Sequence, residues 1–368
     1  MAMTRGRVLM TADTVGGVWS YCLTLAAGLT ARGVATTLAV IGPPPSAAQA
    51  KAASAIPGLR LEHCDRRLEW MPGAAADFAA SAAWLRALAD EADLVHLNGF
   101  AHAALDWGRP CLVVAHSSVH SWWQAVHGSA PPGAYAWYGE AVRSGLKRAG
   151  LLLAPTAAFR DALAACHGRL PPSRVVYNGA DSTRPATASN KVRLVLAAGR
   201  VWDPAKNLAL LDAAAATIDA PVVIAGEHCG PDGRPTALRH AQGLGFLGAA
   251  ELRRAMARAA VFAAPARYEP FGLAILEAAL AGCALVLGEL ASLRELWDGA
   301  AIFVDPNDAA GLAAAINGCL NDGARRQALA RAASERAQAF PSERMVEDTL
   351  AAYRGLGFEV PALGPLAA

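Results

Sequence analysis

The sequence predicts two doubly wound α/β domains joined by a short linker, and three observations support this prediction. The chain has 368 residues, more than a single hydrophobic core normally organises. Short apolar, β-branched runs alternate with longer helical segments, which is typical of parallel sheets whose strands are connected by helices. A polar Ser/Thr/Pro-rich stretch, residues 179–191, interrupts this alternation, and the pattern then starts again.

The first domain is predicted over residues 1–182. A helical segment follows its first strand and ends at Gly33, because a residue without a side chain suits a helix C-cap. The expected strands are 7–12, 34–42, 59–63, 93–98, 111–116, 151–155 and 174–178.

The second domain is predicted over residues 192–340, after a linker at 183–191, and a final helical segment lies within 341–368. Ligands of doubly wound sheets bind outside the carboxyl ends of the strands, so the cleft between two such domains is the predicted ligand site. The expected strands are 192–200, 221–227, 244–248, 261–266, 284–289 and 301–306.

Composition excludes several classes of protein. Apolar residues make up 54% of the chain, and the net charge of +2 contains no basic block, which argues against a nucleic-acid binder. The cysteines are scattered and never spaced C-x-x-C, as is typical of a reducing compartment. The N-terminus has no signal-peptide core, and no apolar run reaches the roughly 18 residues of a transmembrane segment. We therefore expect a cytoplasmic protein.

Two loops at predicted strand ends are candidates for binding an anion. Gly16 and Gly17 follow the first strand and let the backbone approach a ligand, although a double glycine is equally common in ordinary turns. Arg200 and Lys206 lie before the helix that follows strand 192–200. Cations at a helix N-terminus oppose the helix dipole unless an anion lies between them, and a solvated loop is the alternative.

A third loop, RYEPFGLAILEAALAG at 267–282, places Glu269 before a helix and Glu277 on an otherwise apolar face of that helix. A buried carboxylate is costly unless something pairs with it, and the partner is either a core residue or a ligand. The N–H groups of the first helical turn point out of the sheet and suit a phosphate. Two carboxylates around such a turn fit hydroxyl-rich groups on both sides of the phosphate.

The segment EPFGLAILE resembles the E-x7-E signature of retaining glycosyltransferases with the GT-B fold, especially the large fourth family (glycosyl transferases group 1). The resemblance covers about residues 7–340 and is strongest from 193 to 310. It implies two Rossmann-like domains that face each other across a cleft. Further matching segments are GRVWDPAKN, VVYNGAD, GELASLRELWDGAAIFVDPND, TVGGVWSYCLTLA and VVAHSS.

The resemblance also implies roles for individual residues. Arg200 and Lys206 would contact the diphosphate, and Glu269 would hold a sugar hydroxyl and orient the donor. His116 would lie beside the anomeric centre, and Glu277 would bind the ribose. The remaining residues implied in donor binding are Gly16, Gly17, Gly226, Phe246, Leu247, Phe271, Gly272 and Leu273.

The implied reaction is the transfer of a hexose-type sugar from a UDP or GDP sugar to an acceptor hydroxyl by front-face displacement with retention. No metal or other cofactor is expected, because the sequence contains no D-x-D. The acceptor would be a carbohydrate or a lipid-linked carbohydrate used in carbohydrate biosynthesis. Trp122, Trp123 and Trp137 offer aromatic platforms for it, and ordinary packing is an equal alternative.

The sequence is also compatible with other functions. A nucleotide-sugar epimerase on the same fold and a non-catalytic nucleotide-sugar binding protein stay open, although such a binder would be expected to lose Arg200, Lys206 or Glu269. A phosphorylase needs a cofactor lysine in a late helix, whereas Lys206 is the last lysine. In the family the final helix crosses back to the first domain. Many relatives use lipid-linked acceptors, so peripheral membrane contact also stays open.

Overall fold

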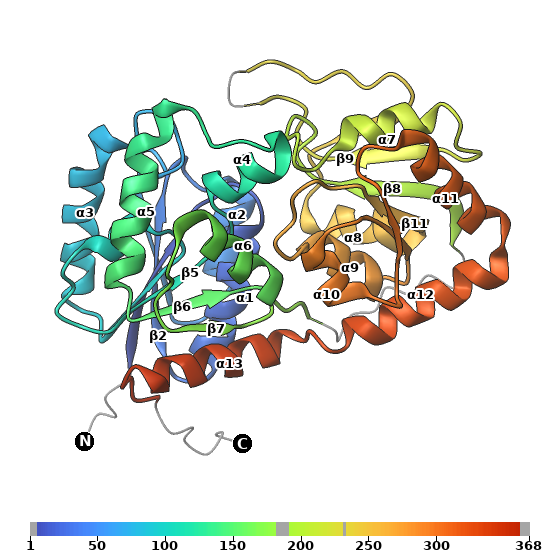
Figure 1. Ribbon diagram of the computed structural model, residues 1–368. Coiled ribbons are helices and arrows are strands. Elements are labelled where there is room, and N and C mark those ends of the chain that lie inside the picture. Colours follow the sequence, from blue (N-terminus) through green and yellow to red (C-terminus); the bar gives the residue numbers. More distant parts are fainter. Residues whose placement is uncertain (1–5, 182–190, 231–232, 361–368) are drawn as a thin grey trace, which may run out of the picture. The chain divides into compact units, whose positions relative to one another are not determined.

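The computed structural model describes residues 6–181, 191–230 and 233–360, which form two compact units (Figure 1). Unit 1 contains the described residues up to Gln124, Ser129–Gly179 and those from Ser342 onward. Unit 2 contains Ala125–Gly128 and the described residues between Ala180 and Pro341. Each unit is built around its own parallel sheet, which confirms the predicted fold class. The predicted linker at 183–191 lies outside the described residues, apart from Lys191.

The sheet of unit 1 has seven parallel strands in the order β3-β2-β1-β4-β5-β6-β7. The chain builds outward from β1 in one direction and then returns to add β4 on the other side of β1. The strands are β1 (Arg7–Ala12), β2 (Ala35–Ile41), β3 (Leu59–Cys64), β4 (Leu94–Leu97), β5 (Cys111–Val114), β6 (Leu151–Ala154) and β7 (Ser173–Val175).

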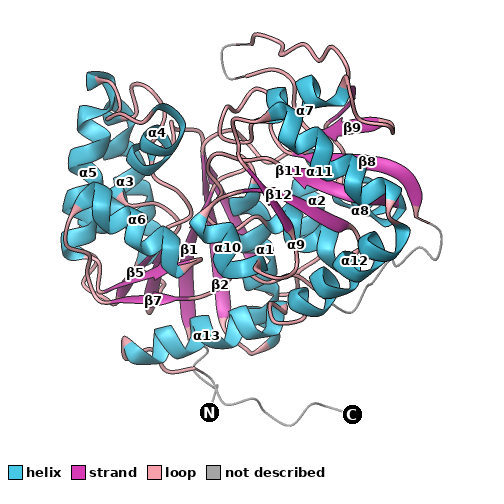
Figure 2. Ribbon diagram, turned by 45° about the vertical axis from the view of Figure 1, so that its right-hand side comes forward, coloured by secondary structure: helices cyan, strands magenta, loops and turns pink. Residues whose placement is uncertain are grey.

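Helices cover both faces of this sheet (Figure 2). On one face, α1 and α13 share an apolar core with alternate residues of β1 and β2, such as Val8 and Leu38. Helices α3 and α5 lie side by side on the other face (Figure 1). The helices are α1 (Gly17–Ala31), α2 (Ala47–Ser54), α3 (Ala75–Ala89), η1 (Ala101–Ala104), α4 (Val119–His127), η2 (Gly133–Tyr135), α5 (Ala136–Arg148), α6 (Ala157–His167) and α13 (Ser342–Gly355).

The helix α13 packs in unit 1 although it is the last element of the chain. Its residues Val346 and Leu350 are fully or almost fully buried in the core that contains Leu25 of α1. The hydroxyl of Tyr353 lies 2.7 Å from Nδ1 of His96 on β4. The apolar residues of α13 therefore pack on the sheet of unit 1, although this helix is far from that sheet in the sequence.

The sheet of unit 2 has six parallel strands in the order β10-β9-β8-β11-β12-β13. All the strands predicted from the sequence form, but the one expected over 244–248 forms earlier, as β10, because Gly245 adopts a left-handed φ of 67° that ends it. The strands are β8 (Val192–Ala198), β9 (Val222–Ala225), β10 (Gln242–Gly245), β11 (Ala259–Ala264), β12 (Ala284–Gly288) and β13 (Ile302–Val304).

Helices α7 and α11 pack together on one face of this sheet, where Leu211 and Ile316 join its apolar core. Helices α8, α9 and α12 lie on the other face (Figure 1). Within the described ranges, no helix has both the length and the apolar run that crossing a membrane requires. The helices are α7 (Leu208–Ala215), α8 (Ala249–Arg258), α9 (Leu273–Leu280), α10 (Ala291–Trp297), α11 (Ala309–Asn321) and α12 (Gly323–Ala337).

Candidate active site

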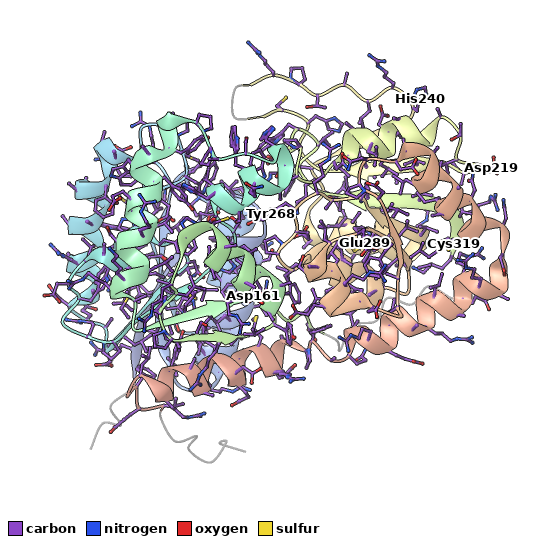
Figure 3. The ribbon with its side chains drawn as sticks, in the orientation of Figure 1. Asp161, Asp219, His240, Tyr268, Glu289 and Cys319 are labelled. Atoms are coloured by element: carbon purple, nitrogen blue, oxygen red, sulfur yellow. The ribbon has the colours of Figure 1, made fainter. Side chains whose placement is uncertain are left out.

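Each sheet has one position where the strand order reverses, between β1 and β4 in unit 1 and between β8 and β11 in unit 2. Ligands of doubly wound sheets bind at such a switch point, outside the carboxyl ends of the strands. In unit 2 this end carries Tyr268, which follows β11, while Asp219, which precedes β9, lies at the opposite end (Figure 3). The loops after β8 and β11 are therefore the natural site within unit 2.

The loop after β8 holds two cations in defined positions. Nη2 of Arg200 donates to Oδ2 of Asp203 at 2.5 Å, and Nε donates to the same oxygen at 3.2 Å. The other oxygen of Asp203 accepts from the backbone N–H of Ala205 at 2.9 Å. Because the Asp203 side chain is only 3% exposed, this carboxylate anchors the turn and the guanidinium together.

Hydrogen bonds join the loop after β11 directly to the loop after β8. The N–H of Arg267 donates to the carbonyl of Ala205 at 2.8 Å, and Nδ2 of Asn207 donates to the carbonyl of Pro265 at 2.8 Å. Across this junction Nζ of Lys206 donates to Oε2 of Glu269 at 2.5 Å. The structure therefore brings together two predicted site residues that are far apart in the sequence.

The turn that leads into α9 requires its glycine. Gly272 has a φ of 89°, and a Cβ atom there would lie 2.7 Å from Cδ1 of Ile275. The carbonyl of Glu269 accepts from Oγ of Ser292 at 2.6 Å, which holds the strand-end loop in place. Phe271 is only 3% exposed and packs edge-on against Phe340. In this structure Phe271 therefore has a packing role.

Helix α9 begins at Leu273, and the N–H of Ile275 already donates to the carbonyl of Gly272 at 3.0 Å, which leaves the N–H groups of Leu273 and Ala274 without an intrahelical partner. These groups and the positive end of the helix dipole suit an anion beside Gly272.

Glu277 lies on the mostly apolar helix α9 and is partly buried. Burial raises its pKa above the ordinary value, and the positive charge of Arg253 opposes that rise. Within the described residues no protein group donates a hydrogen bond to it, in contrast to the paired Glu269. The carboxylate is thus held in an environment that disfavours its charge, which is the costly arrangement expected from the sequence.

The loop after β9 approaches the loop after β8 closely. Gly226 has a φ of 150°, and a Cβ atom there would lie 1.8 Å from the carbonyl oxygen of Gly199. Beyond β10, Phe246 is 74% exposed and Leu247 is partly buried. Phe246 is therefore an accessible aromatic face at the carboxyl end of an outer strand of this sheet.

In unit 1, His116 follows β5 and is held by a neutral hydrogen-bond network. Its Nε2 lies 2.7 Å from Oδ1 of Asn98, whose Nδ2 donates to the carbonyl of Thr11. Since that contact assigns Oδ1 of Asn98 as the acceptor, Nε2 of His116 is the donor. Burial lowers the pKa of His116 to about 4, so the ring is uncharged at neutral pH. Gly16 precedes α1 and Gly17 is its first residue, and both are exposed.

The three candidate tryptophans fall into two groups. Trp122 and Trp123 lie on α4 with their ring centroids 5.5 Å apart, and Trp123 also contacts Tyr135 at 5.9 Å. Trp137 instead packs edge-on against Phe78 of α3, with centroids 5.7 Å apart. Trp137 therefore has an evident packing role, and the α4 pair is the better candidate for an acceptor platform.

Several residues that matter at these strand ends were not predicted from the sequence. They are Asp203, which anchors Arg200, Asn98, which orients His116, and Ser292, which holds the Glu269 carbonyl. Only Asp203 carried a signal, because an acidic residue three positions after an arginine can pair with it in a turn. In the described parts of the chain no three His, Cys, Asp or Glu side chains gather as a metal site requires. Metal independence itself stays a prediction.

Comparisons with known proteins agree with this architecture. The family model described as Glycosyltransferase Family 4 matches residues 15–184, and the model described as Glycosyl transferases group 1 matches residues 192–322. The glycogen synthase of Mycobacterium tuberculosis is 42% identical over 101 residues, 27% of this chain and 24% of that protein. The O-antigen chain mannosyltransferase B of Escherichia coli is 33% identical over 111 residues, 30% of this chain and 29% of that protein. The matching segments thus span under a third of these curated relatives.

Solved structures resemble the whole chain. Sucrose-phosphate synthase from Thermosynechococcus elongatus has a TM-score of 0.78 at 19% identity, covering 96% of this chain and 99% of that one. HepE from Anabaena, in complex with UDP and glucose, has a TM-score of 0.76 at 20% identity, covering 96% and 100%. WaaG, a glycosyltransferase involved in lipopolysaccharide biosynthesis, has a TM-score of 0.69 at 15% identity, covering 93% and 98%.

Two parallel sheets, each with its switch point, and two family models that together span most of the sequence lead to one assignment. The chain belongs to the group 1 glycosyltransferases of family 4 and has their GT-B fold.

Proposed function

We propose that this glycosyltransferase moves a hexose from a nucleoside diphosphate sugar, with UDP or GDP as the nucleotide, to an acceptor hydroxyl with retention and without a metal. One observation carries the proposal. Arg200 and Lys206 are held on the loop after β8 at the switch point of unit 2, and Lys206 is paired with Glu269, which precedes the N-terminus of α9. This is the charge arrangement that a departing diphosphate requires.

The chemistry that these groups support is a front-face displacement. The bond between the anomeric carbon and the phosphate oxygen breaks, and the acceptor oxygen bonds to that carbon from the same face. Negative charge develops on the diphosphate, where Arg200, Lys206 and the positive end of α9 stabilise it. The acceptor's proton passes to an oxygen of the departing phosphate, so no protein base is needed.

His116 fits a role in holding the sugar rather than in proton transfer. With a pKa of about 4, it is a neutral ring whose Nε2 is engaged by Asn98. Nδ1 of that tautomer is a hydrogen-bond acceptor, which suits a sugar hydroxyl.

Glu277 is assigned to the ribose. Two ribose hydroxyls would supply the donors that its buried carboxylate lacks among the described residues, and would favour its charged form. The base is assigned to Gly226, Phe246 and Leu247. These residues follow the parallel strands β9 and β10, so they lie at the same end of the sheet, beyond the carboxyl ends of the strands. The N–H groups of Gly272 and Leu273 are assigned to the phosphates.

The names of two similar proteins support a nucleoside diphosphate sugar as the donor. HepE binds UDP and glucose in its crystal structure, and the Escherichia coli relative is named as a mannosyltransferase. We place the enzyme in the cytoplasm. Its acceptor would be a carbohydrate or a lipid-linked carbohydrate, with Trp122 and Trp123 as the platform.

The first test is a thermal-shift panel of UDP, GDP, ADP, dTDP and their common sugars in the presence of EDTA. A ligand at 100 times its dissociation constant should stabilise the protein by about 2.7 kcal/mol. A shift with one base identifies the donor, and NMR of the anomeric proton in the product then tests retention. No shift with any nucleotide would contradict the proposal, and a shift that appears only with a divalent cation would contradict metal independence.

A further inference from the structure

Each of the two cations proposed to bind the diphosphate is paired with a carboxylate of the protein itself. Arg200 pairs with Asp203 and Lys206 pairs with Glu269, both at 2.5 Å. The four side chains are 33%, 3%, 27% and 15% exposed, in that order. At these strand ends a diphosphate therefore competes with two internal anions.

The two carboxylates are not equivalent. Asp203 also accepts a hydrogen bond from the N–H of Ala205 and is almost completely buried, so it is a permanent part of the turn. The Glu269 carboxylate accepts only from Lys206 among the described residues, while its backbone is fixed independently by Ser292. Glu269 can thus release Lys206 without any change of the main chain.

We propose that Glu269 is a specificity-determining residue that holds Lys206 until a ligand satisfies both side chains at once. The inference rests on the proposed function, in which Lys206 binds the diphosphate and Glu269 binds the sugar. An intact donor supplies a phosphate for Lys206 and hydroxyls for Glu269, so both are paired again after the exchange. The site then selects the intact nucleoside diphosphate sugar against the nucleoside diphosphate product.

The physical reason is the cost of leaving one partner of a mostly buried ion pair without its counter-charge. A free nucleoside diphosphate carries no sugar on the side of Glu269. It must either leave the pair intact and forgo Lys206, or take Lys206 and leave Glu269 unpaired at 15% exposure. Both outcomes weaken the binding of product, which favours its release after transfer.

The test compares the wild type with Glu269→Gln by isothermal titration with UDP and UDP-glucose, or with the matching pair of whichever base stabilises the wild type. Glutamine keeps the shape of the side chain and removes its charge, so Lys206 is free for the phosphate. We expect UDP to bind about threefold to tenfold more tightly, about 0.7 to 1.4 kcal/mol. We expect UDP-glucose to bind no more tightly than before, so the preference for the intact donor shrinks.

A matched control separates this effect from a general change of charge. Glu347→Gln removes the carboxylate of the ion pair between Arg32 and Glu347, at 2.7 Å in unit 1, and should leave both affinities unchanged. Adding Lys206→Met to Glu269→Gln should abolish the tightening.

Unchanged or weaker UDP binding in Glu269→Gln would overturn the inference, because Glu269 would then not compete for Lys206. The proposed function fails separately, if the wild type binds no nucleotide at all.

Discussion

Each unit has a partly buried glutamate at a helix, and the two glutamates differ in their hydrogen-bond partners. In unit 1, Glu69 accepts from the N–H groups of Phe100 and Ala101 at 2.9 and 2.7 Å and so caps η1. In unit 2, Glu277 of α9 has no such donor within the described residues. Burial raises the pKa of both carboxylates, but only Glu69 gains compensating hydrogen bonds. The fold thus explains Glu69, whereas Glu277 has no hydrogen-bond donor among the described residues, which is the observation behind its proposed role.

The same contrast extends to the strand ends. Unit 1 presents neutral groups in a hydrogen-bond network, with His116, Asn98 and Thr11 as its members. Unit 2 presents ion pairs on two loops that are bonded together. A neutral network suits the orientation of a substrate, and cations suit the stabilisation of a negatively charged leaving group, so the difference matches the division of labour that we propose.

The largest expected effect comes from removing a charge of unit 2. Lys206→Met should lower kcat by about 10²- to 10³-fold, because the departing diphosphate loses a cation. Steady-state kinetics would measure this effect, with Lys51→Met on α2 of unit 1 as a control for the loss of a lysine. Normal turnover in Lys206→Met would show that Lys206 does not stabilise the leaving group, and the proposed difference in role between the two units would then be wrong.

A substitution at one tightly packed glycine should destabilise unit 2 and leave unit 1 unchanged. Gly226→Ala places a methyl group 1.8 Å from the carbonyl of Gly199, so we expect unit 2 to lose about 3 kcal/mol. Hydrogen–deuterium exchange of peptides from each unit should show faster exchange around β8 and β9 and little change in unit 1. The matched control is Gly318→Ala inside α11, where the new methyl group meets no atom within 4 Å and the helix should gain stability. Equal exchange in both variants would contradict the close approach of these loops.

Replacing Glu277 or Glu69 by glutamine should change the free energy of unfolding in opposite directions. Glu277→Gln should stabilise unit 2 by about 1 kcal/mol at neutral pH, since it removes a partly buried charge that accepts no hydrogen bond among the described residues. Glu69→Gln should destabilise unit 1 by about 1 to 2 kcal/mol, because an amide nitrogen then faces the N–H of Phe100 or Ala101. Chemical denaturation of each variant measures both values.

Nucleotide binding completes this comparison. Glu277→Gln should weaken binding of UDP or GDP by about tenfold while leaving free pyrophosphate unaffected, which titration calorimetry can separate. Equal weakening of both ligands would show that Glu277 does not hold the ribose.

The smallest expected effect is on pH dependence. Burial lowers the pKa of His96 to about 3 and those of His102, His116 and His167 to about 4, and all four histidines lie in unit 1. An unfolded histidine titrates near 6.5, so between pH 6.5 and pH 4 the unfolded chain binds more protons and unit 1 loses stability as the pH falls. From pH 7.5 to pH 7 the four histidines together lower the free energy of unfolding by about 0.4 kcal/mol, so the melting temperature of unit 1 should fall by about 1 to 2 °C. Hydrogen–deuterium exchange of peptides from each unit at several pH values would test this prediction. If unit 2 lost protection at a higher pH than unit 1, the prediction would be contradicted.

Much of the fold and part of the site could be predicted from the sequence. The strands follow from short apolar runs, because those runs are buried on both faces of a parallel sheet. Glu277 was recognisable as a carboxylate on an apolar helix face. Strand β10 was placed too late because Gly245 ends it with a left-handed φ, which apolar periodicity does not reveal.

What the sequence by itself determined was local: the elements, their alternation, and the positions of charged residues at strand ends. Only the tertiary structure decided which of these charges meet. Lys206 and Glu269 pair because β8 and β11 are neighbours in the sheet, although two other strands lie between them in the chain. Similarly, Tyr353 of the last helix reaches His96 on β4. Such pairings depend on strand order and packing, which arise from long-range burial, whereas the sequence pattern reports only the periodicity of each element.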